Sequence, residues 1–217
     1  MRAHAGMHHP CDSVILMPQG RYTVLGDDGE PVGTESFRSA PGPMGWRYFS
    51  DVETTDPAPH REVVDVAVDE GWRIARVRID TGDHHVLLEP RGHVLAGFRD
   101  DAAIEIPFGP ETHLDYFTPA TNLITTKRLD ATAEIEVAYL SPVTLEPSHE
   151  RQRYELRGPD DVETPSGRFA ATRWTFTALD SGWTADLWVA GDTVVAYDRL
   201  FELAWYEAGA SGARPIQ

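Results

Sequence analysis

The sequence predicts a mainly β protein, built as a curled antiparallel sheet of about 12–15 strands with at most one or two short helices. Two observations support this prediction. Strand-length runs follow one another along the whole chain, with short turns rich in glycine and aspartate between them. No long stretch shows the 3.6-residue apolar period of an amphipathic helix. A sheet of so many strands must curl, so we expect a β-roll, a half-barrel or a closed barrel around an apolar cavity.

The first predicted strands form a hairpin. Residues 21–26 and 32–40 flank a turn in which Asp28-Gly29 supplies the positive φ that tight hairpins favour. A break rich in proline and glycine follows at residues 40–45. Residues 46–53 then alternate aromatic and polar side chains, as a half-buried strand does.

Four strand-length runs come next, and their close spacing leaves no room for crossover helices, which predicts an antiparallel meander. In the second run Val77 and Ile79 share one face, whereas Ile74, Arg76 and Arg78 share the other. A strand with apolar residues on both faces is covered on both sides or lines a pocket. The four runs are residues 61–70, 71–80, 83–90 and 92–100.

The C-terminal half continues the β pattern around one interruption. Thr118-Pro119-Ala120 breaks any long strand, no more than one helical turn is expected near His113, and residues 122–128 are expected to be extended again. Gly158-Pro159-Asp160 is predicted to form a turn. The strand-length runs of this half are residues 101–109, 132–140, 143–147, 151–158, 167–180, 182–191, 193–199 and 200–207.

These runs predict a single β domain over residues 20–208, between a flexible N-terminal tail at 1–19 and a C-terminal tail at 209–217. The first tail contains several potential metal ligands, but they lack the second, well-spaced pair of a zinc site, so no metal centre is predicted. These ligands are His4, His8, His9, Cys11 and Asp12.

The formal net charge of −16 argues against binding to nucleic acid, because phosphate contacts need a positive field. No run approaches the roughly 18 apolar residues of a membrane helix, and the first residues lack the apolar segment of a signal peptide. We therefore expect an acidic cytoplasmic protein without membrane insertion. Cys11 is the single cysteine, so no disulfide can form within the chain, which is compatible with a reducing compartment.

Part of the chain is similar to a known family. The segments DYFTPATNLITTKRL, AEIEVAYL and QRYEL, with VAGDTVVAYDRLFEL nearer the C-terminus, resemble the family of glycolipid-binding β-roll proteins, which are themselves uncharacterised. The likeness covers the C-terminal half, and the N-terminal half shares only the rhythm of hairpins. It implies a half-barrel resembling lipoprotein carriers, with one helix, an apolar interior and a lipid-like or glycolipid-like ligand. The chain departs from the family at His84, His85, His113 and Asp115-Tyr116-Phe117.

Four residues are candidates for acid–base catalysis. His113, Asp115 and Tyr116 lie close together in the sequence, and a histidine titrates near neutral pH while a carboxylate can fix its tautomer. The same residues also fit a polar loop in which Asp115 caps a turn or a short helix near Pro119. His84 is expected on the apolar face of its strand, either as a buried, hydrogen-bonded histidine or as a catalytic base.

Six residues are candidates for ligand contacts. Asn122, the single asparagine, is expected either at the mouth of the cavity or as the residue that closes the turn after Pro119. Arg76 and Arg78 are expected either to meet an anionic ligand or to pair with acidic residues on neighbouring strands. Aromatic side chains on these strands are expected either to form the core or to line the cavity, and the candidates among them are Tyr154, Trp174 and Phe176.

The leading hypothesis is a binding protein that holds a small hydrophobic or amphipathic molecule inside the sheet. The alternative is a small enzyme, such as an isomerase, cyclase, lyase or hydrolase, that uses the same cavity for proton transfer and needs no cofactor. A third reading is a structural or interaction module with a closed core. The expected partner is a small hydrophobic molecule, and a homodimer is left open.

Overall fold

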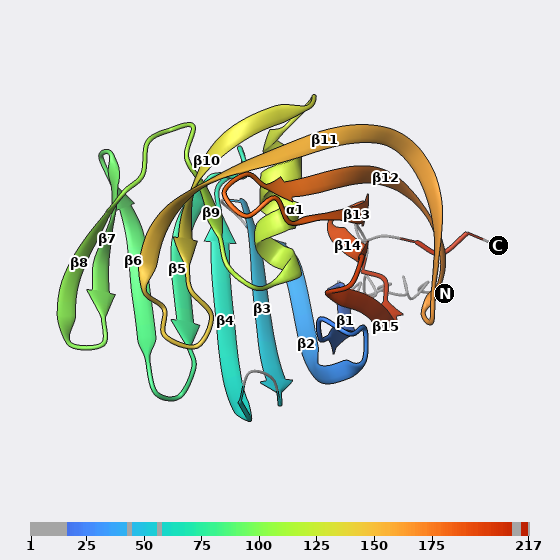
Figure 1. Ribbon diagram of the computed structural model, residues 1–217, viewed down its shortest axis with the longest axis horizontal. Helices are drawn as coiled ribbons and strands as arrows, with labels where there is room; N and C mark the ends of the chain where they lie inside the picture. Colours follow the sequence, from blue (N-terminus) through green and yellow to red (C-terminus); the bar gives the residue numbers. More distant parts are fainter. Residues whose placement is uncertain (1–16, 43–44, 56–57, 210–213, 217) are drawn as a thin grey trace, which may run out of the picture.

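The computed structural model describes residues 17–42, 45–55, 58–209 and 214–216. This part of the chain forms 15 strands and one helix (Figure 1). The elements are β1 (Gln19–Leu25), β2 (Pro31–Gly42), β3 (Gly45–Thr54), β4 (His60–Val68), β5 (Ile74–Asp80), β6 (His85–Arg91), β7 (Val94–Arg99), β8 (Ala102–Pro107), β9 (His113–Asp115), α1 (Pro119–Arg128), β10 (Ala133–Leu140), β11 (Pro147–Thr164), β12 (Gly167–Ala178), β13 (Thr184–Ala190), β14 (Thr193–Tyr197) and β15 (Phe201–Glu207).

All the strands belong to one sheet, in the order β8-β7-β6-β5-β4-β3-β2-β1-β15-β14-β13-β12-β11-β10-β9. Strands β1 and β15 therefore pair in the middle, and β8 and β9 form the two edges. Neighbours are antiparallel except for β9 and β10, which run parallel. The prediction of a curled, mainly β fold is confirmed. The sheet does not close, so a closed barrel is wrong and a half-barrel is right (Figure 1).

Alternation along the strands sets the two faces of the sheet. In β4, Glu62, Val64, Val66 and Val68 are all buried and face the concave side. Helix α1 fills that side, beneath the arch of β11 and β12 (Figure 1), and every residue from Pro119 to Thr126 is buried. The helix therefore occupies much of the interior that the sequence predicts to be an apolar cavity.

The expectation of extended structure at residues 122–128 is wrong, because α1 extends from Pro119 to Arg128. Thr118 is the N-cap, and its hydroxyl accepts a hydrogen bond from the Ala120 N–H. Pro119 at the first helical position has no N–H to satisfy and a φ that suits a helix. No amphipathic period reveals this helix in the sequence, since threonines and Asn122 are buried together with its leucine and isoleucine.

Two predicted boundaries are also wrong. Gly158-Pro159-Asp160 is not a turn, because β11 continues through it with an irregular register between Leu156 and Gly158. Residues 143–147 do not form a separate strand. They belong to a loop in which Val143 and Leu145 have positive φ values of 68° and 56°. The predicted turn at Asp28-Gly29 is confirmed, and Gly29 has a φ of 81°.

The predicted N-terminal tail and its five potential metal ligands lie almost wholly outside the described residues, and β1 begins at Gln19. In the predicted C-terminal tail, Pro215 forms an isolated bridge with Phe169, and the Ile216 N–H donates to the Arg168 carbonyl at 2.7 Å. No helix in the described ranges has the length and hydropathy needed to cross a bilayer.

Candidate functional site

The segment that leads into α1 is attached to the concave face of the sheet by two buried carboxylates. The Tyr116 hydroxyl donates to Glu62 Oε2 at 2.6 Å, and the Thr118 hydroxyl donates to Glu35 Oε1 at 2.7 Å. Tyr48 donates to the same Glu35 oxygen at 2.8 Å. Glu35 and Glu62 lie on β2 and β4, where each is paired with Val52 of the strand between them. Both carboxylates therefore project from one row of the sheet toward the start of the helix.

Glu35 has no exposed surface, and its second carboxylate oxygen, Oε2, has no hydrogen-bond partner among the described residues. Burial raises the pKa of Glu35 from 4.5 to about 7 and outweighs the hydrogen bonds from Thr118 and Tyr48, which lower it. The nearby Glu62 charge raises this pKa further. Glu35 is therefore an interior carboxyl group that gains or loses its proton near neutral pH.

A cavity of about 120 Å³ lies beside this segment, at the N-terminal end of α1. Five of its lining side chains are apolar, and the other lining residues add polar groups, among them side chains from β9, α1, β10 and β14. The volume is close to the roughly 150 Å³ of a cavity that holds a benzene ring. The apolar residues are Phe117, Phe176, Trp183, Leu200 and Phe201, and the other lining residues are Asp115, Tyr116, Thr118, Asn122, Tyr139 and Tyr197.

Asp115 is the ionisable carboxylate in the wall of this aromatic cavity. It accepts hydrogen bonds from Gln152 Nε2 at 2.6 Å and from the Thr121 hydroxyl at 3.2 Å. Burial raises the pKa of Asp115 from 3.8 to about 6, although these two hydrogen bonds lower it. A carboxylate with this pKa in an aromatic environment can accept a proton at neutral pH more readily than an ordinary aspartate.

Asn122 lines the same cavity from the first turn of α1. Its Oδ1 accepts a hydrogen bond of 2.8 Å from the Tyr154 hydroxyl on β11. Phe176 lies next to Tyr154 in the register of β11 and β12 and also lines the cavity. Trp174 is buried in the core two residues away. Asn122, Tyr154 and Phe176, three of the candidates for ligand contacts, thus lie together, with Asn122 bonded to a side chain on a distant strand.

His113 lies on β9 and is buried, and its Nδ1 is 3.2 Å from the Thr125 hydroxyl. Burial lowers the pKa of His113 from 6.5 to about 3, and the positive charge of Arg128 adds to this effect. The ring is therefore neutral at physiological pH and weakly basic. No hydrogen bond or ion pair joins His113 to Asp115 in the described structure.

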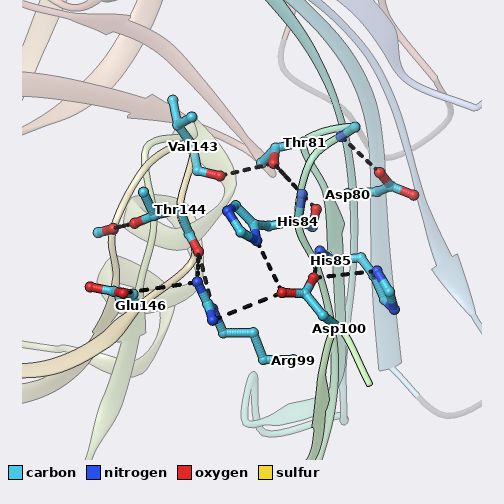
Figure 2. A network of polar contacts seen from close by, with 11 residues as sticks. Asp80, Thr81, His84, His85, Arg99, Asp100, Val143, Thr144 and Glu146 are labelled. Carbon is cyan, nitrogen blue, oxygen red and sulfur yellow. Dashed lines mark hydrogen bonds and ion pairs between the residues drawn. The ribbon is translucent and has the colours of Figure 1, made fainter. Parts of the chain in front are cut away.

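His84 lies in the turn between β5 and β6, and its side chain is 34% exposed, so the expected burial on an apolar strand face is wrong. Its ring lies beside Asp100 (Figure 2), and the distance from His84 Nδ1 to Asp100 Oδ2 is 3.0 Å. Arg99 of the same network donates to the Thr144 carbonyl at 3.1 and 2.7 Å, and Thr81 donates to the Val143 carbonyl at 2.9 Å. This network joins the turns near β5 and β7 to the loop between β10 and β11.

Arg76 and Arg78 alternate along β5 with the buried Val77 and Ile79, so they lie on the convex face, away from the cavity. Arg76 pairs with Asp65 at 3.2 Å, as expected for cross-strand charges. The prediction that these arginines contact a ligand inside the sheet is therefore wrong, because the sheet separates them from the interior.

Sequence reasoning missed the two interior carboxylates and several cavity residues. Glu35 could have been recognised, because it shares the inward face of β2 with Phe37 in an alternating pattern. Trp183, Tyr197 and Phe201 come from three neighbouring segments of the C-terminal meander, and only the curl of the sheet brings them to α1.

No protein-family model matches the chain, and no curated protein matches it. Solved structures do match. A DUF1089 family protein from Pseudomonas aeruginosa aligns with a TM-score of 0.55 and 18% identity, over 77% of this chain and 91% of that one. A β-barrel-like protein of the domain of unknown function DUF1849 from Brucella abortus aligns with a TM-score of 0.52 and 7% identity, over 91% of this chain and 99% of that one. The chain has a β-barrel-like fold. At these identities the likeness concerns the fold alone, and function must be argued from the site.

Proposed function

We propose that the protein binds a small hydrophobic or amphipathic molecule and holds its apolar end in the cavity at the start of α1. The observation that supports this is the combination of five apolar lining residues with polar groups from Asp115, Asn122 and Tyr139. The cavity volume of about 120 Å³ suits one ring or a short alkyl segment. A lipid-like or glycolipid-like ligand would therefore insert one end and leave its polar group outside.

The resemblance to glycolipid-binding β-roll proteins agrees with this proposal. The polar cavity residues can accept or donate hydrogen bonds to the first polar atom of the ligand, and the aromatic residues exclude water from its apolar end. The ligand class that fits is a molecule with a narrow apolar end, such as a fatty acid, an alkyl glycoside or a monocyclic aromatic compound.

The test uses Leu200→Trp, which adds volume in the cavity wall, and Leu87→Trp, which adds the same side chain at an exposed position on β6. Fatty acids and alkyl glucosides of increasing chain length are titrated while bound ligand is measured by native mass spectrometry. We expect wild type and Leu87→Trp to bind and Leu200→Trp to lose at least ~10-fold in affinity. Equal binding by all three proteins would show that the ligand lies elsewhere.

The second candidate function is proton transfer at the same cavity, and the raised pKa of Asp115 favours it. Asp115 would be the base, and Asn122 or Tyr139 the donor that polarises a substrate carbonyl. This activity would be measured as the replacement of the α-protons of a small aromatic ketone by deuterium in deuterium oxide. We expect exchange by wild type and none by Asp115→Asn. Exchange that is unchanged in this variant would eliminate Asp115 as the base.

A further inference from the structure

A second hollow lies at the opposite end of α1 from the aromatic cavity. It has a volume of about 690 Å³, within the range of roughly 300–1,000 Å³ that is usual for ligand sites. Its walls are the turn before β5, the turn at residues 109–112, the C-terminal end of α1 and the first half of β10. We call this hollow the β10 cleft.

One wall of the β10 cleft is an unpaired strand edge. On one side, β10 pairs with β11 along its whole length, from Ala133 to Leu140. On the other side, the short strand β9 covers only Val137 to Tyr139. Within the described residues, the segment Ala133–Glu136 therefore has no strand partner on the cleft side, and no turn or loop backbone bonds to it. A free row of N–H and C=O groups is a template for one more strand.

Two guanidinium groups, of Arg73 and Arg128, line the same cleft without an ion pair in the described structure. Arg128 donates to the carbonyls of Thr112 at 3.0 Å and Pro110 at 2.8 Å. In the described structure neither Arg128 nor Arg73 has a carboxylate oxygen within the 4.0 Å of an ion pair. Burial lowers the pKa of Arg128, and repulsion by Arg73 lowers it further, whereas the charges of Glu111 and Asp69 raise it. An anion between the two guanidinium groups would relieve this repulsion.

The overall negative charge of the chain does not cancel this local attraction. Charges separated by more than about 8 Å are largely screened at physiological ionic strength, so an anion inside the cleft interacts mainly with its nearest neighbours. The third cation at the cleft, Lys127, is already paired with Asp192 at 2.7 Å. The two arginines are therefore the cations that remain for a ligand, in a cleft that Glu111, Glu134 and Glu136 also line.

The direction of β9 fixes the orientation of an added strand. A strand that extends β9 backward along the free edge, in the same direction, ends beside Thr112, where the Arg128 guanidinium lies. Its C-terminal carboxylate would meet both arginines, whereas a reversed strand would place its positive N-terminus there. Glu134 and Glu136 share one face of β10 and disfavour acidic side chains along the strand. The negative charge of a suitable ligand is thus confined to its C-terminus.

We propose that the β10 cleft binds the C-terminal end of an extended peptide, which adds to β10 as a parallel strand and places its terminal carboxylate between Arg73 and Arg128. Backbone hydrogen bonds along the free edge provide affinity, and the two guanidinium groups select the free carboxylate. This site is separate from the aromatic cavity, and it does not depend on the function proposed for that cavity.

The experiment uses the full chain and a fluorescein-labelled pool of random hexapeptides with free C-termini, measured by fluorescence anisotropy. The same pool with amidated C-termini is the matched ligand control. We expect the free-acid pool to bind and the amidated pool to bind at least ~10-fold more weakly, since amidation removes the charge that the arginines select. Failure of the free-acid pool to bind, or equal binding of both pools, overturns the proposal.

Two further measurements separate a carboxylate site from strand addition. Arg73→Gln should weaken binding of the free-acid pool about 10-fold, whereas Arg78→Gln, at an exposed position on the convex face of β5, should not. Hydrogen exchange should slow in Ala133–Glu136 when the pool binds. Equal loss in both variants, or acetate that competes as strongly as the peptides, overturns strand addition at this cleft.

Discussion

At the scale of single residues, Glu35 connects the sheet to the helix and also links stability to pH. The folded-state pKa of about 7 is above the ordinary value of 4.5, so the folded protein retains the proton over a range where the unfolded chain has lost it. The contribution of protonated Glu35 is therefore greatest below pH 4.5 and is lost as the pH rises to 7. The difference between these two pKa values corresponds to about 3 kcal/mol.

Glu35→Gln should abolish the part of the pH dependence of the free energy of unfolding that Glu35 causes. The amide oxygen of the introduced glutamine can accept from Tyr48 and Thr118 as the carboxylate does, and its amide nitrogen can donate to the Ser50 hydroxyl oxygen close by. Wild type should lose about 3 kcal/mol of its free energy of unfolding between pH 4.5 and pH 8, and the variant should not. The difference between the variant and wild type should therefore increase by this amount. Urea unfolding at several pH values measures this. Glu53→Gln, at an exposed site on β3, is the control, and a difference that does not change with pH would contradict the assignment.

Thr118 has two roles, since it caps α1 and donates to Glu35. Thr118→Ala should lower the free energy of unfolding by about 2 kcal/mol, because the helix loses its cap and a buried carboxylate loses a donor. Thr118→Ser retains the hydroxyl and should lose less than half as much. Thermal and urea unfolding measure the difference. If serine were as unfavourable as alanine, packing of the methyl group would be the cause.

The candidate residues show what a sequence can reveal about a site. Asp115 and Asn122 are recognisable as chemically capable groups near a proline in a β-rich chain. Their partners, Gln152 and Tyr154, are not recognisable as partners, because those contacts depend on the register of β11 and on the position of α1 inside the sheet. His113 is a candidate for its nearness to Asp115 in sequence, yet its side chain bonds to Thr125 on the helix.

At the scale of elements, the strands are predictable from the sequence, whereas the extent of the helix that begins at Pro119 is not. Alternation of inward and outward residues in β1, β3 and β4 agrees with the burial that the structure has. Residues 122–128 of α1 are not recognisable as helical from the apolar period, because burial on nearly all sides removes the polar face on which an amphipathic pattern depends. The Gly-Pro step of the long strand β11 resembles a turn, but the sheet accommodates it as a local irregularity.

The loop between β10 and β11 contains an unfavourable backbone conformation that can be relieved. Val143 is β-branched and has a φ of 68°, a region that costs such a residue about 1 kcal/mol or more. Val143→Gly should therefore raise the free energy of unfolding by about 1 kcal/mol, as measured by urea unfolding. Val162→Gly, within β11, is the control and should lower it by about 1 kcal/mol. Loss of stability in both variants would contradict the presence of strain at Val143.

At the scale of the whole molecule, the network of Figure 2 spans the opening of the curled sheet. Arg99 and Thr81 belong to the β5–β7 region, near one edge, and they bond to the loop after β10, near the other edge. These contacts join the two ends of a sheet whose edge strands do not pair. The half-barrel is therefore closed on this side by polar side chains and loop carbonyls.

Arg99→Gln should loosen this closure without unfolding the sheet. The loop at residues 141–146 loses two hydrogen bonds to the Thr144 carbonyl, so its amide hydrogen exchange should become at least ~10-fold faster, whereas exchange in β1 and β15 should not change. Arg91→Gln, at the end of β6, is the control. If amide hydrogen exchange in the loop did not change, the hydrogen bond from Thr81 and side-chain packing would be sufficient to keep the loop in place.

Because β1 pairs with β15, the order of the strands in the sheet is a circular permutation of their order in the sequence. If the segment between β8 and β9 were opened and residues 19 and 207 were joined, every strand would follow its sheet neighbour in sequence. In the natural order, the two groups of strands, β1–β8 and β9–β15, are instead joined within the sheet by the pairing of β1 with β15, whose residues Gln19 and Glu207 are 188 positions apart. Such a distant contact is slow to form, so a circular permutant would have a lower contact order and should fold faster than the natural chain.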